Sequence, residues 1–291
     1  MTEYARPETL DSALRVLARP GARALAGGTD LAGQLDRRIV SAEVIVDLQA
    51  LELDGIHARD GGLVLGATAT LAEVAASELV APYAAVGTAA SEAASPLLRN
   101  LGTVAGNLCQ GTRCWYFRGH EWHCWLGGGD TCYAQIGDHR KHNLEPGDCI
   151  AAHPSDLAPA LAVCGATVVV RSNDGERELP LLELYRRPTE ENRSLTVLEP
   201  GELVTEARLP PPPDSSVYLR VGERQAFSFP LVSVAAARRE GTISLTAAGI
   251  ANIPRALDPN DPLAGLPGNP QSAWKRDVLA TLVERALAAL D

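Results

Sequence analysis

Apolar residues recur at helical spacing near the N-terminus and form short continuous runs after it. Residues 7–18 place Leu10, Leu14 and Leu17 on one helical face, and Pro20-Gly21 follows as a stop signal. The runs at 23–26 and 43–48 are short, apolar and flanked by polar residues, which is typical of strands. The pattern predicts one helix and two strands in a small opening α/β unit.

A second set of elements starts at Gly62 and resumes after a long segment without clear periodicity. Thr70 is a good N-cap for one of its helices, and Ser155 and Gly165 can begin and end another. The expected elements are a strand at 63–67, helices at 70–80, 82–94 and 156–164, and a strand at 166–171.

The pattern of apolar and polar residues changes beyond about residue 181. Residues 202–209 read as a strand that ends in Pro210–Pro213, a stiff linker without amide donors. Two β-rich runs at 231–238 and 242–250 are joined at Glu240-Gly241, as in a hairpin, and an amphipathic helix at 273–290 closes the chain.

These elements predict an α+β fold. We expect an N-terminal domain over residues 1–176, divided into subdomains at about 1–55 and 56–176, with a loop insert at 109–150. A smaller C-terminal domain of antiparallel sheet plus helices should occupy residues 177–291.

Composition and charge narrow the class of protein. The chain has 291 residues, is 46% hydrophobic and 21% charged, and carries a net charge of −10 without any Lys/Arg-rich run. This argues against nucleic acid as a partner, because phosphate contacts need clustered cations. No signal peptide begins the chain and no segment has the roughly 18 apolar residues of a membrane span. A cytoplasmic location is therefore expected, where six cysteines are better explained as metal ligands, catalytic thiols or packing residues than as disulfides.

Two glycine-rich loops are candidates for binding a phosphate-containing ligand. Gly27-Gly28-Thr29-Asp30 follows a predicted strand, and residues 100–107 hold two further glycines. Neither is a P-loop or a GxGxxG fingerprint, and a plain turn explains the first loop alone about as well. Together they suggest one long ligand with its pyrophosphate at one of them.

Residues 109–150 hold four cysteines at 114, 124, 132 and 149, so their positions differ by 10, 8 and 17. This is neither a zinc knuckle nor a ferredoxin run, and spacing alone leaves the metal open. Aromatic residues crowd the same segment and would either surround a metal centre or form a small core for the loop: Trp115, Tyr116, Phe117, Trp122, Trp125 and Tyr133.

Other residues of interest in this region have weaker interpretations. Cys164 is expected to be a buried packing thiol, and Cys109 lies outside the ligand pattern. Arg113 and Arg118 either balance anionic charge or are solvated. The histidines of the insert are expected to be solvated: His120, His123, His139 and His142.

Four segments resemble the FAD-binding medium subunits of the molybdenum hydroxylases, which include xanthine dehydrogenase, carbon monoxide dehydrogenase and 4-hydroxybenzoyl-CoA reductase. They are LAGGTDL (25–31), LRNLGTVAGNL (98–108), HPSDLAPALAVCGATV (153–168) and ELVTEARLP (202–210). The resemblance covers essentially the whole chain. It implies that residues 1–176 form a PCMH-type FAD-binding domain and residues 177–291 a C-terminal flavoprotein domain.

The resemblance also assigns residues to the FAD. Those expected at the pyrophosphate are Ala26, Gly27, Gly28, Thr29, Asp30, Thr103, Gly106 and Asn107. Asp156 matches a residue that contacts the adenosine, and Leu203 matches an apolar residue beside the flavin ring. Arg220 stands where many members have a lysine near the flavin, which keeps the charge but changes the donor geometry.

A subset of the family carries a similar cysteine insert, among them 4-hydroxybenzoyl-CoA reductase and some bacterial aldehyde oxidoreductases. The segment from Gln110 to Arg118 and the later cysteines resemble that subset. By this resemblance the metal ligands are Cys114, Cys124, Cys132 and Cys149, and they bind an extra [4Fe–4S] cluster.

The implied function is an FAD- and [4Fe–4S]-containing electron-transfer subunit, without catalytic residues of its own. It would serve a heterotrimeric molybdenum-dependent hydroxylase or dehydrogenase acting on an aldehyde, aromatic or N-heterocyclic substrate. The implied partners are a large molybdopterin-binding subunit, a small [2Fe–2S] subunit and a soluble redox partner such as a ferredoxin; export on a partner's signal is compatible with this assembly. Two alternatives stay open, a zinc-stabilised non-redox scaffold protein and a free-standing flavin oxidase.

Overall fold

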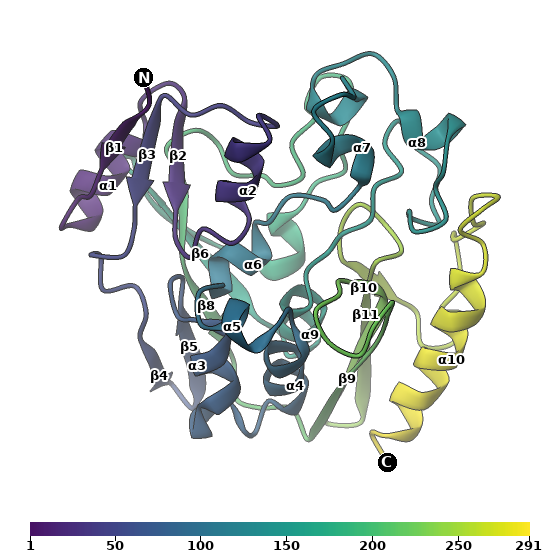
Figure 1. Cartoon of the computed structure of the whole chain (residues 1–291). Helices are drawn as coiled ribbons and strands as arrows, with labels where there is room; N and C mark the ends of the chain where they lie inside the picture. Colours follow the sequence, from purple (N-terminus) through teal and green to yellow (C-terminus); the bar gives the residue numbers. More distant parts are fainter.

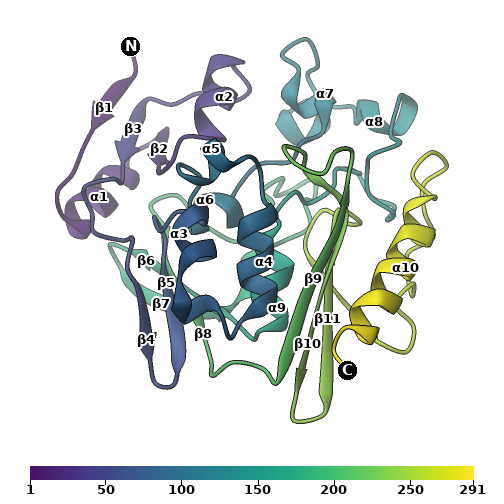
Figure 2. The ribbon, with the colours of Figure 1, turned by 60° about the horizontal axis from the view of Figure 1, so that its bottom comes forward.

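The computed structural model describes all 291 residues, which form three sheets arranged side by side with helices packed between and beside them (Figures 1 and 2). The N-terminal sheet has the order β1-β3-β2 and is parallel throughout. Its elements are β1 (Glu3–Ala5), α1 (Leu10–Leu17), β2 (Ala22–Leu25), α2 (Leu31–Asp36) and β3 (Val44–Asp47). Thr9 caps α1, and the helix buries the predicted apolar face against the sheet. The small opening α/β unit is thus confirmed.

The second sheet is antiparallel and draws its strands from distant parts of the chain. Its order is β4-β5-β8-β6-β7. The strands are β4 (Ile56–Arg59), β5 (Gly62–Gly66), β6 (Thr167–Ser172), β7 (Gly175–Pro180) and β8 (Leu203–Leu209). Because β8 pairs with both β5 and β6, the sheet continues across the expected domain boundary at 176/177, which falls inside β7. The change to the next sheet comes at Pro210–Pro213, where proline cannot supply ladder donors.

Short helices cover this second sheet. They are α3 (Leu71–Ala76), η1 (Glu78–Val80), α4 (Ala84–Glu92), α5 (Pro96–Arg99), α6 (Val104–Leu108), α9 (Leu157–Val163) and η3 (Leu181–Leu184). Thr70 is the N-cap of α3, as expected, in a capping box with Glu73. Gly165, at φ +80°, ends the α9 segment as expected.

The C-terminal sheet has the order β12-β11-β10-β9 and is antiparallel, with a helix on each side (Figure 2). Its elements are β9 (Ser215–Gly222), β10 (Pro230–Arg239), β11 (Thr242–Ala248), β12 (Arg255–Leu257) and α10 (Lys275–Ala288). Alternate residues of β10 face opposite cores: Val234 and Ala236 pack with α10, while Ala235 and Ala237 join the core of the second sheet. The predicted hairpin and closing helix are confirmed.

The insert contains only short helical turns, α7 (Trp115–Arg118), η2 (Trp125–Gly127) and α8 (Tyr133–Ile136). Its C-terminal end is fastened to the C-terminal sheet. Leu144 is fully buried in the core beneath α10, and its N–H donates to the Ile250 carbonyl at 2.9 Å. Lys275, also fully buried, donates from Nζ to the carbonyls of Lys141 and Gly249 at 2.8 Å each.

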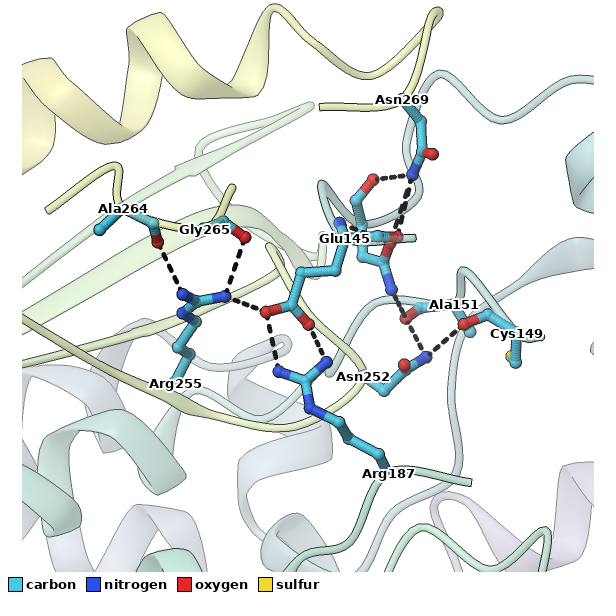
Figure 3. A network of polar contacts seen from close by, with 10 residues as sticks. Glu145, Cys149, Ala151, Arg187, Asn252, Arg255, Ala264, Gly265 and Asn269 are labelled. Carbon is cyan, nitrogen blue, oxygen red and sulfur yellow. Dashed lines mark hydrogen bonds and ion pairs between the residues drawn. The ribbon is translucent and has the colours of Figure 1, made fainter. Parts of the chain in front are cut away.

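Polar contacts complete this attachment (Figure 3). The buried Glu145 carboxylate accepts from both Arg187 and Arg255. Asn252 donates to the carbonyls of Cys149 and Ala151 at 3.0 and 2.8 Å. The insert is therefore bound to the C-terminal sheet by apolar burial and by a satisfied polar network. None of the helices in the chain is long and apolar enough to cross a membrane.

Leu144→Ala should lower the free energy of unfolding by about 2–4 kcal/mol, because truncating a fully buried leucine removes its transfer energy and leaves a cavity. Urea unfolding followed by circular dichroism measures this. The matched control is Leu97→Ala, since Leu97 is 80% exposed and its truncation should leave the stability within about 0.5 kcal/mol of wild type. Equal effects of the two substitutions would contradict the anchoring.

Candidate functional site

The two glycine loops lie against each other and line one cleft of about 350 Å³, which we call the glycine-loop cleft. From the predicted cofactor residues it collects Ala26, Gly27, Gly28, Thr29, Asp30, Thr103, Gly106 and Leu203. Segments almost 180 positions apart along the chain thus meet at one surface. Asn107, Asp156 and Arg220 are the predicted cofactor residues that do not line it.

Glycine is required at two positions of the first loop. A Cβ on Gly27 would meet the Leu101 carbonyl oxygen at 1.5 Å, so the loops could not pack with any side chain there. Gly28 has φ +70°, a conformation that side chains disfavour. The N–H groups of Gly27, Gly28 and Thr29 donate to no protein acceptor. They are free to bind an anion in the cleft.

Asn107 supports the second loop from behind. Its Oδ1 accepts from Ser155 Oγ at 2.6 Å and from the Leu157 N–H at 3.3 Å, while Ser155 Oγ accepts from the Ala158 N–H at 2.9 Å. The expected capping of this helix by Ser155 is thus present, and Asn107 joins it. The contacts tie the loop to the start of α9.

Asp156 and Arg220 form a buried ion pair rather than lining the cleft. Arg220 Nη1 lies 2.9 Å from Asp156 Oδ1, which also accepts from Tyr218 Oη at 2.6 Å. Burial raises the pKa of Asp156 to about 6, although Arg220 and Tyr218 oppose the shift. The family resemblance implies that Asp156 contacts the adenosine and that Arg220 lies near the flavin, and in this structure the two side chains touch each other. Arg220 also donates to the Ser228 carbonyl and so orders the loop between β9 and β10.

Asp30 connects the first glycine loop to the insert. Its Oδ1 accepts from Arg113 at 2.6 Å and Arg118 at 2.8 Å, and its Oδ2 accepts from the Gly111 N–H and from Gln34 at 2.8 Å each. Burial pushes the pKa of Asp30 up, but the two guanidinium groups outweigh it and hold the pKa below its ordinary value. Arg113 and Arg118 are therefore neither free surface cations nor charges placed directly at the cysteines.

The four predicted metal ligands line one small apolar hollow in the insert, the cysteine hollow. Its wall consists of Cys114, Tyr116, Phe117, Cys124, Trp125, Leu126, Cys132, Tyr133, Ala134, Cys149 and Ala151. Four of the six aromatic residues of the segment thus pack around the thiols, while Trp115 and Trp122 do not line the hollow. No three His, Cys, Asp or Glu side chains of the chain lie in an arrangement that would hold a single metal ion.

Three of these cysteines occupy the N-cap positions of short helical turns: Cys114 before α7, Cys124 before η2 and Cys132 before α8. Backbone N–H groups of each turn therefore face the sulfur. Burial raises the pKa of Cys114 to about 12, and the N–H groups of Phe117 and Tyr116 oppose that shift. Burial also raises the pKa of Cys124, and the N–H groups of Gly127 and Leu126 oppose that shift. Such donors stabilise a sulfur that carries negative charge.

Two histidines of the insert are not solvated, contrary to expectation. His139 is 6% exposed and accepts a hydrogen bond from the Gln271 N–H at Nε2, 3.3 Å away. His142 is 3% exposed, and its Nε2 lies 3.1 Å from Cys114 Sγ. Sequence reasoning missed them because the segment looks polar; Leu144, two residues after His142, was the available signal of burial.

Cys164 is buried in the main core, as expected, while Cys109 is exposed and lines the glycine-loop cleft.

A second cavity, of about 300 Å³, lies between the insert and the β9–β10 loop; we call it the aromatic hollow. Trp115, Phe227 and Phe229 contribute rings, and the Arg113 guanidinium stands 4.2 Å from the Phe229 ring centroid. Cys114 lines both this hollow and the cysteine hollow. The Asp30–Arg113 ion pair joins it to the glycine-loop cleft, since each partner lines one of the two cavities.

Unpartnered polar atoms concentrate at the aromatic hollow. Four buried side-chain nitrogen or oxygen atoms of the chain have no hydrogen-bond partner, and three belong to residues that line this hollow: Arg113 Nε, His142 Nδ1 and His153 Nε2. Buried polar atoms are normally paired, so three unpaired atoms among the residues of one wall are exceptional, and none of the three is open to the hollow itself. Sequence reasoning did not identify the hollow, because its lining comes from five separate segments.

Comparisons with known proteins agree with this geometry. A family model described as the FAD binding domain in molybdopterin dehydrogenase matches residues 1–212, ending at the proline linker. The aldehyde oxidoreductase FAD-binding subunit PaoB of Escherichia coli K12 is 36% identical over 89% of this chain and 84% of its own length. The carbon monoxide dehydrogenase medium chain of Afipia carboxidovorans is 25% identical over 87% of this chain and 75% of its own length.

Solved structures show the same fold. Quinoline 2-oxidoreductase from Pseudomonas putida 86 contains a chain that superposes with a TM-score of 0.73 at 19% identity, covering 100% of this chain and 96% of that one. A carbon monoxide dehydrogenase chain from Hydrogenophaga pseudoflava gives a TM-score of 0.74 at 18% identity, with 99% and 96% covered. The arrangement of α/β subdomains and a C-terminal sheet domain is therefore confirmed.

Asp30→Asn should destabilise the chain by about 3 kcal/mol, because it leaves two largely buried guanidinium groups without a counter-charge. Urea unfolding and the FAD content of the purified protein measure the effect on fold and cleft, and both should fall. Asp36→Asn, on the exposed side of the same α2 helix, is the matched control. If Asp30→Asn were as stable as wild type, the ion pairs of Asp30 with Arg113 and Arg118 would not be stabilising the fold.

Arg220→Met should cost about 3–5 kcal/mol and should make stability depend on pH. Without Arg220 the pKa of the buried Asp156 rises further above that of an unfolded aspartate. An acid with a raised folded-state pKa stabilises the fold when protonated and loses that contribution as the pH rises through the folded-state value. When unfolding is measured at about pH 5 and about pH 8, the free energy of unfolding of the variant should fall further below that of wild type at the higher pH. Arg224→Met, in the adjoining β9–β10 loop and exposed, should show neither effect; equal deficits at both pH values would refute the pairing.

Proposed function

Because this chain belongs to the family of FAD-binding domains of molybdopterin dehydrogenases, we propose that it is the electron-transfer subunit of a molybdenum-dependent hydroxylase or dehydrogenase. We further propose that it carries a [4Fe–4S] cluster in addition to FAD. The observation that supports this most directly is the order of the three cavities: glycine-loop cleft, aromatic hollow and cysteine hollow adjoin in that sequence.

The residues present fit an FAD spread over the first two cavities. The free N–H groups of Gly27, Gly28 and Thr29 would bind the pyrophosphate. The isoalloxazine ring suits the aromatic hollow, whose lining includes the aromatic residues Trp115, Phe227 and Phe229. Arg220 orders the loop of this hollow through Ser228, in keeping with a place near the flavin. Leu203 would then face the adenosine half, the reverse of the contact that the family resemblance implies.

The residues of the cysteine hollow fit an iron–sulfur cluster. Four thiols converge on one apolar hollow, and N-terminal N–H groups of helical turns face three of the sulfurs. Hydrogen bonds to sulfur and exclusion of water are how proteins tune such a cluster. A zinc ion bound by the same four thiols is the scaffold alternative, and the metal analysis below decides between the two.

The chain's own residues bind, orient and insulate these groups. FAD, once bound, exchanges electrons in pairs or singly and so links two-electron chemistry to one-electron carriers. Cys114 lines both the cysteine hollow and the aromatic hollow, so at that point this residue is all that separates the two sites. Catalysis on the substrate is left to a partner, since we assign no catalytic base in the chain.

Partners and substrate follow from the family as proposals. We propose assembly with a large molybdopterin-binding subunit and a small [2Fe–2S] subunit, and exchange of electrons with a soluble partner such as a ferredoxin. The substrate class is an aldehyde, or an aromatic or N-heterocyclic compound; the Escherichia coli relative is named an aldehyde oxidoreductase subunit. A cytoplasmic site of action, or export together with a partner, fits this assembly.

The deciding experiment is to measure iron, acid-labile sulfide, zinc and FAD on the chain purified from its own host without oxygen. We expect about four iron, about four sulfide and one FAD per chain, with two further subunits co-purifying. Zinc without sulfide or flavin would overturn the proposal in favour of a scaffold. FAD with no iron and no partners would favour a free-standing flavin oxidase.

Cys124→Ser should lose most of the iron and sulfide while retaining FAD, because Cys124 lines the cysteine hollow and not the glycine-loop cleft. The matched control is Cys164→Ala, a buried thiol of the main core, which should keep the full iron content. Unchanged iron in Cys124→Ser would remove this residue from the ligand set.

A further inference from the structure

Cys114 differs from the other three predicted ligands in having an imidazole beside its sulfur. His142 Nε2 lies 3.1 Å from Cys114 Sγ, whereas no histidine is hydrogen-bonded to Cys124, Cys132 or Cys149. Cys114 also borders the aromatic hollow, and so does His142. This histidine therefore stands where the cysteine hollow and the aromatic hollow meet.

Packing holds His142 in place from several sides. Its ring meets Trp115 edge to face, with centroids 5.1 Å apart at 83°, and lies 6.3 Å from the Tyr116 ring. The backbone N–H of His142 donates to the His139 carbonyl at 3.0 Å. The carbonyl of the preceding Lys141 accepts from the buried Lys275. A ring fixed in this way has a defined orientation toward the sulfur.

We propose that His142 is a positioning residue for the predicted cluster ligand Cys114, donating from Nε2 to its thiolate. This inference rests on the function proposed above. A neutral imidazole carries one N–H, so donation by Nε2 leaves Nδ1 as an acceptor, and Nδ1 is buried without a partner in the protein. Because no protein acceptor lies at Nδ1, nothing there draws the ring proton away from Nε2.

The electronic consequence follows from charge. Reduction adds one electron to the cluster and increases the negative charge on its sulfur ligands, so a donor to Cys114 stabilises the reduced form more than the oxidised form. His142 therefore raises the reduction potential of the cluster. An electron exchanged between a bound flavin and a bound cluster would neither form nor break a bond to His142.

Three substitutions test the contact with Cys114. Gln at 142 places an amide N–H near the former Nε2, whereas Asn and Leu place no donor there. The measurements are the reduction potential of the cluster, from EPR-monitored titration, and that of the flavin, from absorbance, both on the full chain with its cofactors. His142→Asn and His142→Leu should shift the cluster to a lower potential, and His142→Gln should restore most of the wild-type value.

The control is His139→Gln, because His139 is equally buried in the insert but is hydrogen-bonded to the Gly137 carbonyl and to Gln271, not to a cysteine. It should lower thermal stability and leave both potentials unchanged. Wild-type potentials in His142→Leu with full iron would overturn the proposal. Loss of iron in His142→Gln as well as His142→Leu would also overturn it, by making His142 a ligand or a purely structural residue. If His142→Leu does not fold, His142→Asn decides by the same criterion. A wild-type chain without iron and sulfide refutes the proposed function itself, a result that differs from each of these.

Discussion

The carboxylate of Asp30 is the interaction on which the arrangement of the three cavities depends. It ends the first glycine loop, and it binds two arginines and a backbone N–H of the insert. A largely buried carboxylate is stable only with such partners, since burial alone would disfavour its charge. The first glycine loop, which we propose binds a pyrophosphate, and the loop that carries the cysteines are therefore held in one fixed relation. This relation places the aromatic hollow between them.

The far end of the insert depends on a different set of contacts. Leu144, Glu145 and Lys275 bind it to the C-terminal sheet and to α10, with Asn252 holding the carbonyls of Cys149 and Ala151 (Figure 3). A loop fastened at both ends can position side chains more accurately than one fastened at its base alone. The C-terminal domain thus acts as the support of the cysteine hollow, although it contributes none of the four thiols. The ordering of the β9–β10 loop by Arg220 extends the same support to the aromatic hollow.

Local patterns predicted the regular elements well. The capping box at Thr70, the stop at Gly165 and the hairpin at Glu240-Gly241 depend on residues close together in the chain, so they could be recognised from sequence. The insert was interpreted less well. Its histidines were expected in solvent because their neighbours are polar, whereas burial of His142 depends on Trp115, Lys275 and other residues far along the chain.

By itself the sequence determined the α+β class, the two glycine loops with most of the cleft residues, and the four cysteines that gather in one hollow, because each depends on residue type and short-range spacing. Tertiary structure alone decided three other matters. It paired β8 with both β5 and β6, so that the sheet crosses the division expected near residue 176. It turned Asp156 and Arg220 toward each other and assigned Asp30 to the insert. It also formed the aromatic hollow and set His142 against Cys114. The physical reason is common to all three: a buried charge or an unpaired strand edge must find a partner, and which one it finds depends on how distant segments pack.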